Sequence, residues 1–413
     1  MKKKSTIQNI FFNTFGSVFY YGCQWLITVL VVRIAGYDEG GNYNLAMTFT
    51  AWLGVFALYN TRQFQVSDVT GDYLNKTYIN SRLISSGIAI AACLIALPFN
   101  HYSSYKFLII LMYMVFKIGE AFVDVFHGID QKAGRMDLVC YSFMARGVLM
   151  LVSFCGVLYL TKNQVYAVLA MVITTFAVIF AFDIPMANRF RDRAEEAKAY
   201  REVGKDQLKN LMIVLLPLVI VGVTNNLSIT LPKYFLERFL GSEALGYYSS
   251  VATPSTVVQL AASTVFVPLL TPLAGKVHAL DWDGFYGILK KVSIAFAGAF
   301  VVAIVGAYLL GDWFLKLLFP GIDAYTYLFV PVVASALLIS VNASLFSVCT
   351  VLRELKGQVV VGVVGLLVSM ATSIFFIPSI GMDGVLVSLY ISLGVQIIIE
   401  LICIIHKIKV MRS

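Results

Sequence analysis

The sequence predicts an all-α, polytopic membrane protein with about twelve transmembrane helices. Of its 413 residues, 59% are apolar and only 13% are charged, and the mean hydropathy is +0.82. A soluble domain of this composition could not cover its surface with polar side chains, so an ordinary cytosolic or secreted protein and a disordered chain are excluded. The apolar runs are too long for barrel strands and do not alternate, which indicates helices.

The apolar runs follow one another at regular intervals, and each is close to the roughly 20 residues that a helix needs to cross a bilayer. The first run is too long for the apolar region of a signal peptide, and no cleavage site of small residues follows it, so we expect an uncleaved first span. The expected spans are 11–32, 43–60, 80–98, 106–126, 137–160, 164–184, 209–231, 245–272, 288–310, 324–348, 358–378 and 383–405.

The longest polar segment lies between the sixth and seventh spans and divides the chain into two halves. Its charges of both signs recur at helical spacing, which is typical of an amphipathic surface helix. We therefore expect an N-terminal six-helix lobe at 1–187, a cytoplasmic amphipathic linker at 188–210 and a C-terminal six-helix lobe at 211–413.

Lysine and arginine indicate the orientation, because cytoplasmic loops carry the excess of basic residues. With the N-terminus inside, the segments expected outside hold only Arg33, Lys106, Lys162, Lys233, Arg238 and Lys316. Both termini are therefore expected in the cytoplasm. The net charge of +8 follows this topology and forms no basic patch with interleaved aromatic residues, so we expect no nucleic-acid partner.

The sequence carries none of the common catalytic motifs. Its six cysteines are not spaced as CxxC and its four histidines are scattered, so we expect no metal and no cofactor. The absence of GxxxxGK[ST], GxSxG and HExxH argues against ATP hydrolysis and against an enzyme. The acidic pair Asp38-Glu39 in the first outer loop has two interpretations, solvated loop charge or the carboxylates of a membrane glycosyltransferase, and the loop is very small for the second.

Ionisable residues inside expected spans need a physical reason, because a charge in hydrocarbon is costly. Lys117, Glu120 and Asp124 lie three and four residues apart, on one face of the fourth span. Arg146 in the fifth span lies about 13 Å from the cytoplasmic side, near the level of Glu120. Two interpretations remain open: a neutralised network that holds helices together, or the lining of a water-filled substrate path.

The second half has almost no ionisable residues in the central parts of its spans, and Glu400 lies near an inner end. Its polar candidates are Asn225 and Asn226, and Gln24 is a similar candidate in the first span. Each could line a substrate path, although hydrogen bonding between helices is the commoner role of such residues. We expect the glycine pairs at 298 and 306 and at 362 and 365 to allow close helix packing.

Two segments resemble a known family. Residues 231–249 (LPKYFLERFLGSEALGYYS) resemble the connection between spans seven and eight of polysaccharide repeat-unit flippases. Residues 127–137 (HGIDQKAGRMD), with Ser142 and Arg146-Gly147 after them, resemble the inner loop between spans four and five of the same proteins. These are the Wzx-like flippases for O-antigen, capsule and teichoic-type polymers, in the multidrug/oligosaccharidyl-lipid/polysaccharide exporter (MOP) superfamily.

The resemblance implies two six-helix lobes around a central cavity that opens to each side of a bacterial inner membrane in turn. It implies an undecaprenyl-pyrophosphate-linked oligosaccharide as the substrate, for lipopolysaccharide or capsule, and coupling to an ion gradient as in an antiporter. Membrane lipids and the polysaccharide polymerase and chain-length machinery are the other implied partners. Arg146, Lys117, Gln24, Asn225 and Asn226 are then the candidates for substrate binding. Glu120 and Asp124 are the candidates for ion coupling.

Two alternatives of other classes remain. The first is a small-molecule or drug exporter of the same superfamily, which would confer resistance when overexpressed. The second is a membrane-embedded glycosyltransferase, whose loss would remove one glycosidic linkage. The flippases for the lipid-linked peptidoglycan precursor are noted for charged residues in their first span. Here only Gln24 lies in the middle of that span, which argues against this branch.

Overall fold

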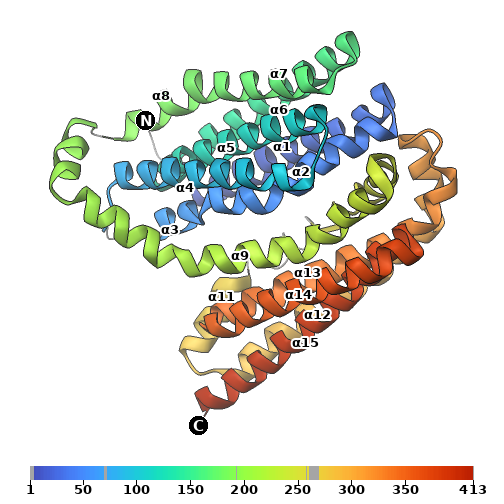
Figure 1. Ribbon diagram of the computed structural model, residues 1–413. Helices are drawn as coiled ribbons and strands as arrows, with labels where there is room; N and C mark the ends of the chain where they lie inside the picture. The colour runs from blue at the N-terminus through green and yellow to red at the C-terminus, as the bar shows by residue number, and fades with distance from the viewer. Residues whose placement is uncertain (1–3, 69–71, 192, 257, 260–268, 413) are drawn as a thin grey trace. The chain divides into compact units, whose positions relative to one another are not determined.

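The computed structural model describes residues 4–68, 72–191, 193–256, 258–259 and 269–412, and every regular element within these ranges is helical (Figure 1). The chain divides into two compact units, unit 1 (Met1–Val223) and unit 2 (Thr224–Ser413). Each unit is described by itself.

The helices that lie wholly in unit 1 are α1 (Thr6–Ala35), α2 (Tyr37–Leu58), α3 (Thr61–Ser67), α4 (Asn75–Ala96), η1 (Pro98–Asn100), α5 (Ser104–Lys132), α6 (Met136–Thr161), α7 (Gln164–Val178), η2 (Ile179–Asp183), α8 (Ile184–Ala187) and η3 (Asn188–Phe190). Helix α9 (Arg193–Ala252) begins in unit 1 and continues into unit 2. The remaining helices of unit 2 are α11 (Leu270–His278), α12 (Trp282–Leu318), η5 (Asp323–Leu328), α13 (Phe329–Val351), α14 (Leu355–Ile380) and α15 (Met382–Arg412).

Among the described residues, nine helices are long and apolar enough to cross a membrane, so the chain is a multi-pass membrane protein. Helices α2 and α5 coincide with the expected spans at 43–60 and 106–126 but are not among the nine. In α5 the reason is the charged group at its middle, where Lys117, Glu120 and Asp124 interrupt the apolar run. The count of about twelve spans stays a prediction.

The expected loop between 231 and 245 is not a loop. Helix α9 runs through this segment, and a single residue, Gly241, leaves the helical conformation, with φ +87° and ψ 175°. Glycine has no Cβ and adopts positive φ without strain, so the chain changes direction here at one residue. Two expected spans, 209–231 and the first part of 245–272, are therefore joined at a kink; residues 260–268 of the second lie outside the described residues.

The segment expected as a linker, 188–210, is helical from Arg193 onward and continues without a break into the following span. Asp192 lies outside the described residues. The side chain of Gln207 accepts hydrogen bonds from the Leu74 amide (3.3 Å) and the Thr77 hydroxyl (2.9 Å), so this part of α9 is attached to the start of α4. The boundary between the units falls later, after Val223, and the three-part division predicted from the sequence stays a prediction.

Small residues allow close packing of helices in unit 1. Helix α1 packs along α6, and Gly16 lies so close to this partner that a Cβ there would be 2.8 Å from the Cα of Cys140. On the same pair of helices, a Cβ at Gly147 would be 3.2 Å from the Cys23 sulfur. Close backbone approach through small residues is the usual basis of helix association in membranes, and it fixes how α1 and α6 face each other.

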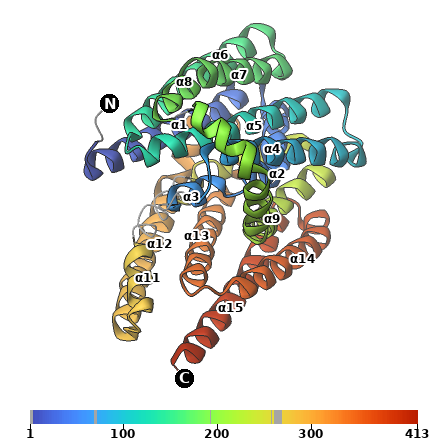
Figure 2. The same cartoon turned by 90° about the vertical axis from the view of Figure 1, so that its left-hand side faces the viewer.

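In unit 2, α14 and α15 run side by side and α13 packs on α15 (Figures 1 and 2). A Cβ at Gly365 would overlap the side-chain amide of Gln396, and one at Gly362 would overlap the Thr224 hydroxyl, which confirms the predicted close packing of this glycine pair. The glycine pair in α12 is different. A Cβ at Gly298 or Gly306 would meet no described atom within 4 Å, so that prediction is wrong within the described part of the unit.

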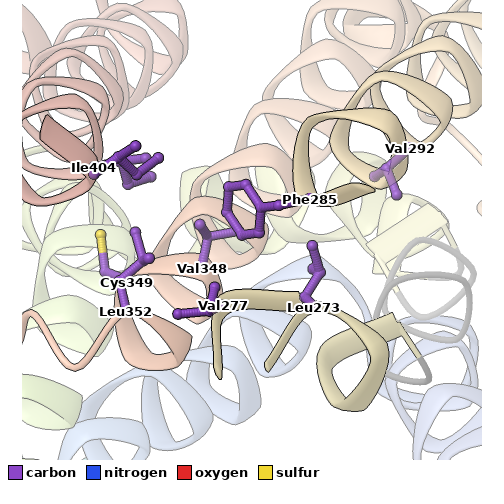
Figure 3. Close-up of a cluster of buried hydrophobic side chains, with 9 residues drawn as sticks. Leu273, Val277, Phe285, Val292, Val348, Cys349, Leu352 and Ile404 are labelled. Atoms are coloured by element: carbon purple, nitrogen blue, oxygen red, sulfur yellow. The ribbon is translucent and has the colours of Figure 1, made fainter. Parts of the chain in front are cut away.

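An apolar cluster closes one end of unit 2 (Figure 3). It joins α11, α12, α13 and α15 through nine buried side chains: Leu273, Val277, Phe285, Val292, Val348, Cys349, Leu352, Ile404 and Ile408. Such a cluster excludes water from the neighbouring helix surfaces, which raises the cost of any charge placed beside it.

Candidate functional site

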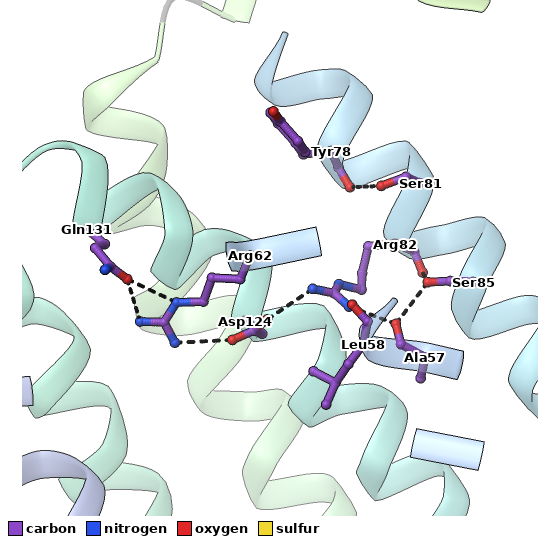
Figure 4. Close-up of polar contacts among 9 residues, drawn as sticks. All are labelled: Ala57, Leu58, Arg62, Tyr78, Ser81, Arg82, Ser85, Asp124 and Gln131. Carbon is purple, nitrogen blue, oxygen red and sulfur yellow. Dashed lines mark hydrogen bonds and ion pairs between the residues drawn. The ribbon is translucent and has the colours of Figure 1, made fainter. Parts of the chain in front are cut away.

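Two groups of charged residues in unit 1 are centred on carboxylates of α5, and the first is centred on Asp124 (Figure 4). Its carboxylate accepts from Arg62 of α3 at 3.1 Å and from Arg82 of α4 at 3.0 Å. Arg62 also donates to Oε1 of Gln131, at 3.0 and 3.2 Å. Asp124 is thus neutralised by two guanidinium groups, and the group as a whole keeps a positive charge.

The position of Arg82 follows from the end of α2. At Tyr59 and Asn60 the backbone adopts the left-handed conformation, with φ of 46° and 50°, and α2 stops. The last carbonyl groups of a helix lack partners within the helix and carry partial negative charge. Arg82, fully buried, donates to the carbonyl of Ala57 at 2.8 Å and also contacts the carbonyl of Leu58. The Arg82 guanidinium therefore both caps the C-terminal end of α2 and pairs with Asp124.

The second group is centred on Glu120. Lys117 donates to its Oε2 at 2.6 Å, while the Tyr20 hydroxyl (2.6 Å) and the Gln24 amide (2.9 Å) donate to Oε1. Gln24 therefore bonds between helices α1 and α5. The side chains of Lys117 and Glu120 are 26% and 19% exposed, so this ion pair is half-buried and partly accessible.

Arg146 lies behind this pair in the packed interior. It is 1% exposed, and its guanidinium carbon lies 4.9 Å from the ring centre of Tyr20 and 5.2 Å from that of Phe143. Its Nε donates to the Ser142 hydroxyl at 3.2 Å, whereas Nη2 has no hydrogen-bond partner among the described residues. The Tyr20 ring contacts the Arg146 guanidinium, and its hydroxyl donates to Glu120. Tyr20 therefore links Arg146 to the Lys117–Glu120 ion pair.

A histidine and an aspartate adjoin Arg146. His127 Nε2 lies 3.2 Å from the Ser142 hydroxyl and 3.3 Å from Oδ1 of Asp183, and both His127 and Asp183 are 1% exposed. Asp183 ends η2, a short π-helical segment just before Pro185. Such segments widen the helix locally and are frequent at functional sites, and here the segment brings a carboxylate against α5 and α6.

The structure thus brings together some of the predicted residues and separates others. Lys117, Glu120 and Gln24 are in direct contact, and Arg146 joins them through Tyr20. Asp124 belongs to a different group with two arginines. Asn225 and Asn226 lie in unit 2, both half-buried, and Oδ1 of Asn226 has no partner among the described residues.

Sequence reasoning missed five residues of the site: Tyr20, Arg62, Arg82, His127 and Asp183. Arg62 and Arg82 were counted only as basic residues at the inner ends of spans, where they support the orientation. One signal was present for Arg82, because it falls inside the first turn of the expected span at 80–98. No comparable signal marked Tyr20, since an aromatic residue in a span is ordinary.

The charges of this site suit the binding of an anion. Among the residues that the structure describes, no three His, Cys, Asp or Glu side chains lie close enough to hold a metal ion. In the two groups and their neighbour Arg146, cations outnumber the carboxylates Glu120 and Asp124. Lys117 and Arg62, with 26% and 21% of their side chains exposed, are the cations that an anionic ligand could reach.

The fold defines a polytopic helical membrane protein with charged side chains in its interior. A family described as "Polysaccharide biosynthesis protein" matches residues 6–278, and the chain belongs to it. The Staphylococcus aureus "Capsular polysaccharide biosynthesis protein CapF" is 26% identical over 302 residues, which cover 72% of this chain and 73% of that protein. The resemblance seen in the sequence is confirmed at the level of this polysaccharide biosynthesis family.

Solved structures show the same fold at low identity. The lipid II flippase MurJ in an inward closed conformation has a TM-score of 0.69 at 12% identity, covering 97% of this chain and 90% of that one. An inward-facing multidrug resistance MATE transporter has a TM-score of 0.66 at 12% identity, covering 96% and 95%. A mutant of the Vibrio cholerae MATE transporter VcmN has a TM-score of 0.63 at 13% identity, covering 98% and 96%.

Proposed function

We propose that this transporter is a flippase that moves a polyprenyl-pyrophosphate-linked oligosaccharide repeat unit from the cytoplasmic to the outer leaflet by alternating access, driven by an ion gradient. Membership of the polysaccharide biosynthesis family supports a role in building a surface polymer. The name of the Staphylococcus aureus relative points to a capsule as that polymer. The MATE likeness is one of fold alone and lends no specific support to drug export.

The observation that carries the proposal is a partly exposed cation inside a helix expected to span the membrane, Lys117 of α5, in the same unit as the cations Arg62, Arg82 and Arg146. A pyrophosphate carries several negative charges, and moving it through hydrocarbon without counter-charges is prohibitive. Charge-assisted hydrogen bonds from Lys or Arg lower that cost and are stronger than neutral ones. Lys117 combines a location inside α5 with partial exposure, so it is the best-placed of the proposed contacts.

The other residue roles are proposals of the same kind. Arg146 would act on the substrate through the field that it projects past Tyr20, because its own side chain is buried. Gln24, Asn225 and Asn226 would donate or accept hydrogen bonds to sugar hydroxyl groups. Glu120 and Asp124, proposed for ion coupling, would each have to leave a cation before taking up a proton.

A deletion strain tests the function directly. It should retain the complete lipid-linked oligosaccharide on the cytoplasmic leaflet, beyond the reach of an external glycosidase, while a complemented strain exposes it. An intermediate shortened by one sugar would instead identify a transferase, and an intermediate equally accessible in both strains would end the flippase proposal.

Reporter fusions test the proposed location, a bacterial inner membrane with both termini cytoplasmic. A reporter that is active only outside the cytoplasm should be active when fused after Asn163 or Gly311. It should be silent after Arg201 or Lys356. Activity after Arg201 would overturn the orientation.

A further inference from the structure

Unit 2 contains a buried carboxyl group for which the structure provides no partner. Glu400 of α15 is 1% exposed, and neither of its side-chain oxygens has a hydrogen-bond partner among the described residues. Glu354, at the start of α14, is different: it pairs with Lys407 at 3.2 Å, and both side chains are partly exposed. Lys407 is therefore paired with the accessible carboxylate and not with the buried one.

Among the described residues, no cation pairs with Glu400. Helices α13 and α14 pack along α15, and α11 and α12 meet its last turns in the apolar cluster. Cys349 of α13 and Cys403 of α15 lie within electrostatic range of Glu400, and Glu354 acts on the same two thiols. One turn further along α15, Ile404 meets Cys349 and Leu352 in the apolar cluster of Figure 3. These neighbours are thiols, aliphatic groups and a second carboxylate, which all disfavour a negative charge.

The helix packing holds a second unpartnered polar group on the same face. Gln396 lies one turn before Glu400, is 1% exposed, and neither its amide oxygen nor its amide nitrogen has a partner among the described residues. Gly365 of α14 approaches this amide so closely that a Cβ at position 365 would overlap it. Neither polar group can therefore reach water while α14 and α15 stay packed as they are.

We propose that Glu400 is a proton-binding site of this transporter, protonated while α14 and α15 are packed together and deprotonated when they separate. In the cycle, an O–H bond forms at one carboxylate oxygen with a proton from water on one side. It breaks to return that proton to water on the other side. The proposal rests on the proposed ion-driven function and assigns the ion and its residue.

The contrast with unit 1 supports this choice over Glu120 and Asp124. Those carboxylates each accept two or more hydrogen bonds or ion pairs from Lys117, Tyr20, Gln24, Arg62 or Arg82, and such donors stabilise the charged form. Glu400 has no such donor or cation among the described residues, so its charge state depends on whether the packed helices exclude water from it. Proton release from Glu400 would in turn favour separation of α14 and α15, because the charge needs water.

Infrared spectroscopy of the purified full-length chain in lipid nanodiscs tests the protonation without any substrate. At neutral pH, the difference between wild type and Glu400→Gln should contain the C=O band of one protonated carboxyl group, lost in the variant. Glu354→Gln is the matched control, since its carboxylate is ion-paired and should leave that band in place. An unchanged band in Glu400→Gln overturns the proposal.

Surface polysaccharide in cells then tests the coupling. Glu400→Gln mimics the protonated state, so protein level and melting temperature should stay normal while surface polymer falls about tenfold or more. Glu354→Gln should export normally. Normal export by Glu400→Gln would overturn the coupling role of Glu400 and leave it a structural, uncharged residue. Export by the wild-type protein that depends on a Na⁺ gradient and not on the proton gradient would overturn the coupling role as well.

The two proposals fail in distinguishable ways. Normal surface polymer in the deletion strain would overturn the flippase function while leaving the infrared result on Glu400 standing. Loss of polymer in the deletion strain with no infrared band at Glu400 would overturn only the proton site.

Discussion

Two carboxylates of unit 1 and one of unit 2 have opposite surroundings. Glu120 and Asp124 of α5 each contact a cation and at least one further donor, whereas Glu400 of α15 contacts neither among the described residues. A paired carboxylate holds a fixed charge that organises its neighbours and contributes to a steady field. An unpaired buried carboxyl changes its charge with the packing around it. The difference separates residues suited to holding an anionic substrate from a residue suited to driving movement.

The largest effect on this comparison is expected from Arg82→Ala. The substitution removes a fully buried cation and takes a donor from one oxygen of Asp124 and from the carbonyls of Ala57 and Leu58, of which Ala57 keeps the Ser85 hydroxyl. Breaking one member of a buried pair costs about 3–5 kcal/mol, so protein level and the thermal midpoint in detergent should fall strongly. The double variant Arg82→Ala with Asp124→Asn should recover part of this lost stability. A structural pair would be contradicted if Arg82→Ala alone stayed stable, or if the double variant were no more stable than Arg82→Ala.

Lys117→Ala should act on export more than on stability. Glu120 keeps its bonds from Tyr20 and Gln24, so the protein should accumulate normally. Loss of one charge-assisted contact to phosphate, worth about 1.5–3 kcal/mol, should lower surface polymer about tenfold or more. If Lys117 serves only to neutralise Glu120, then Lys117→Ala combined with Glu120→Gln restores export, and the proposed substrate contact fails.

Gly365→Ala should test the packing that encloses Gln396 and Glu400. A methyl group there would overlap the Gln396 amide, so overpacking should cost about 1–3 kcal/mol and lower the thermal midpoint. Gly298→Ala in α12 is the matched control, since a Cβ there would meet no atom of the described residues within 4 Å and alanine favours a helix by about 0.5–1 kcal/mol. Equal midpoints for the two variants would show that α14 and α15 are not tightly packed at this point.

The smallest effect is expected at Asp68, outside the spans. Burial raises the pKa of this carboxyl, but hydrogen bonds from the amides of Asp72 and Tyr73 and from the Tyr78 hydroxyl outweigh burial, so its pKa lies below the ordinary value. A lowered pKa in the folded state stabilises the fold above the unfolded pKa, and this stabilisation is lost as the pH falls through the folded pKa.

Asp68→Asn should therefore reduce the thermal midpoint slightly at neutral pH. The gap from wild type should narrow as the solution is acidified, because the wild-type side chain is then neutral too. Thermal melts of both proteins across the acidic range measure this. A gap that stays constant with pH would contradict the assigned hydrogen bonds.

Local physics let the sequence by itself determine much of this protein. Long apolar runs must be helical in a bilayer because each backbone group needs a partner within its own segment, so helices and a multi-pass architecture follow. The spacing of three between Lys117 and Glu120 fixes their contact on one helix face, and the structure contains that ion pair. Family membership followed from two short motifs and is confirmed over residues 6–278.

Only the tertiary structure decided which partners meet between helices. Asp124 lies four residues after Glu120 on the same helix, yet its partners Arg62 and Arg82 come from α3 and α4. Glu400 resembles any charge at the end of a span until α13 and α14 enclose it. Contacts between helices depend on the depth and rotation at which they pack. Close approaches such as Gly16 on Cys140 and Gly365 on Gln396 set that rotation, and no spacing within a single helix encodes it.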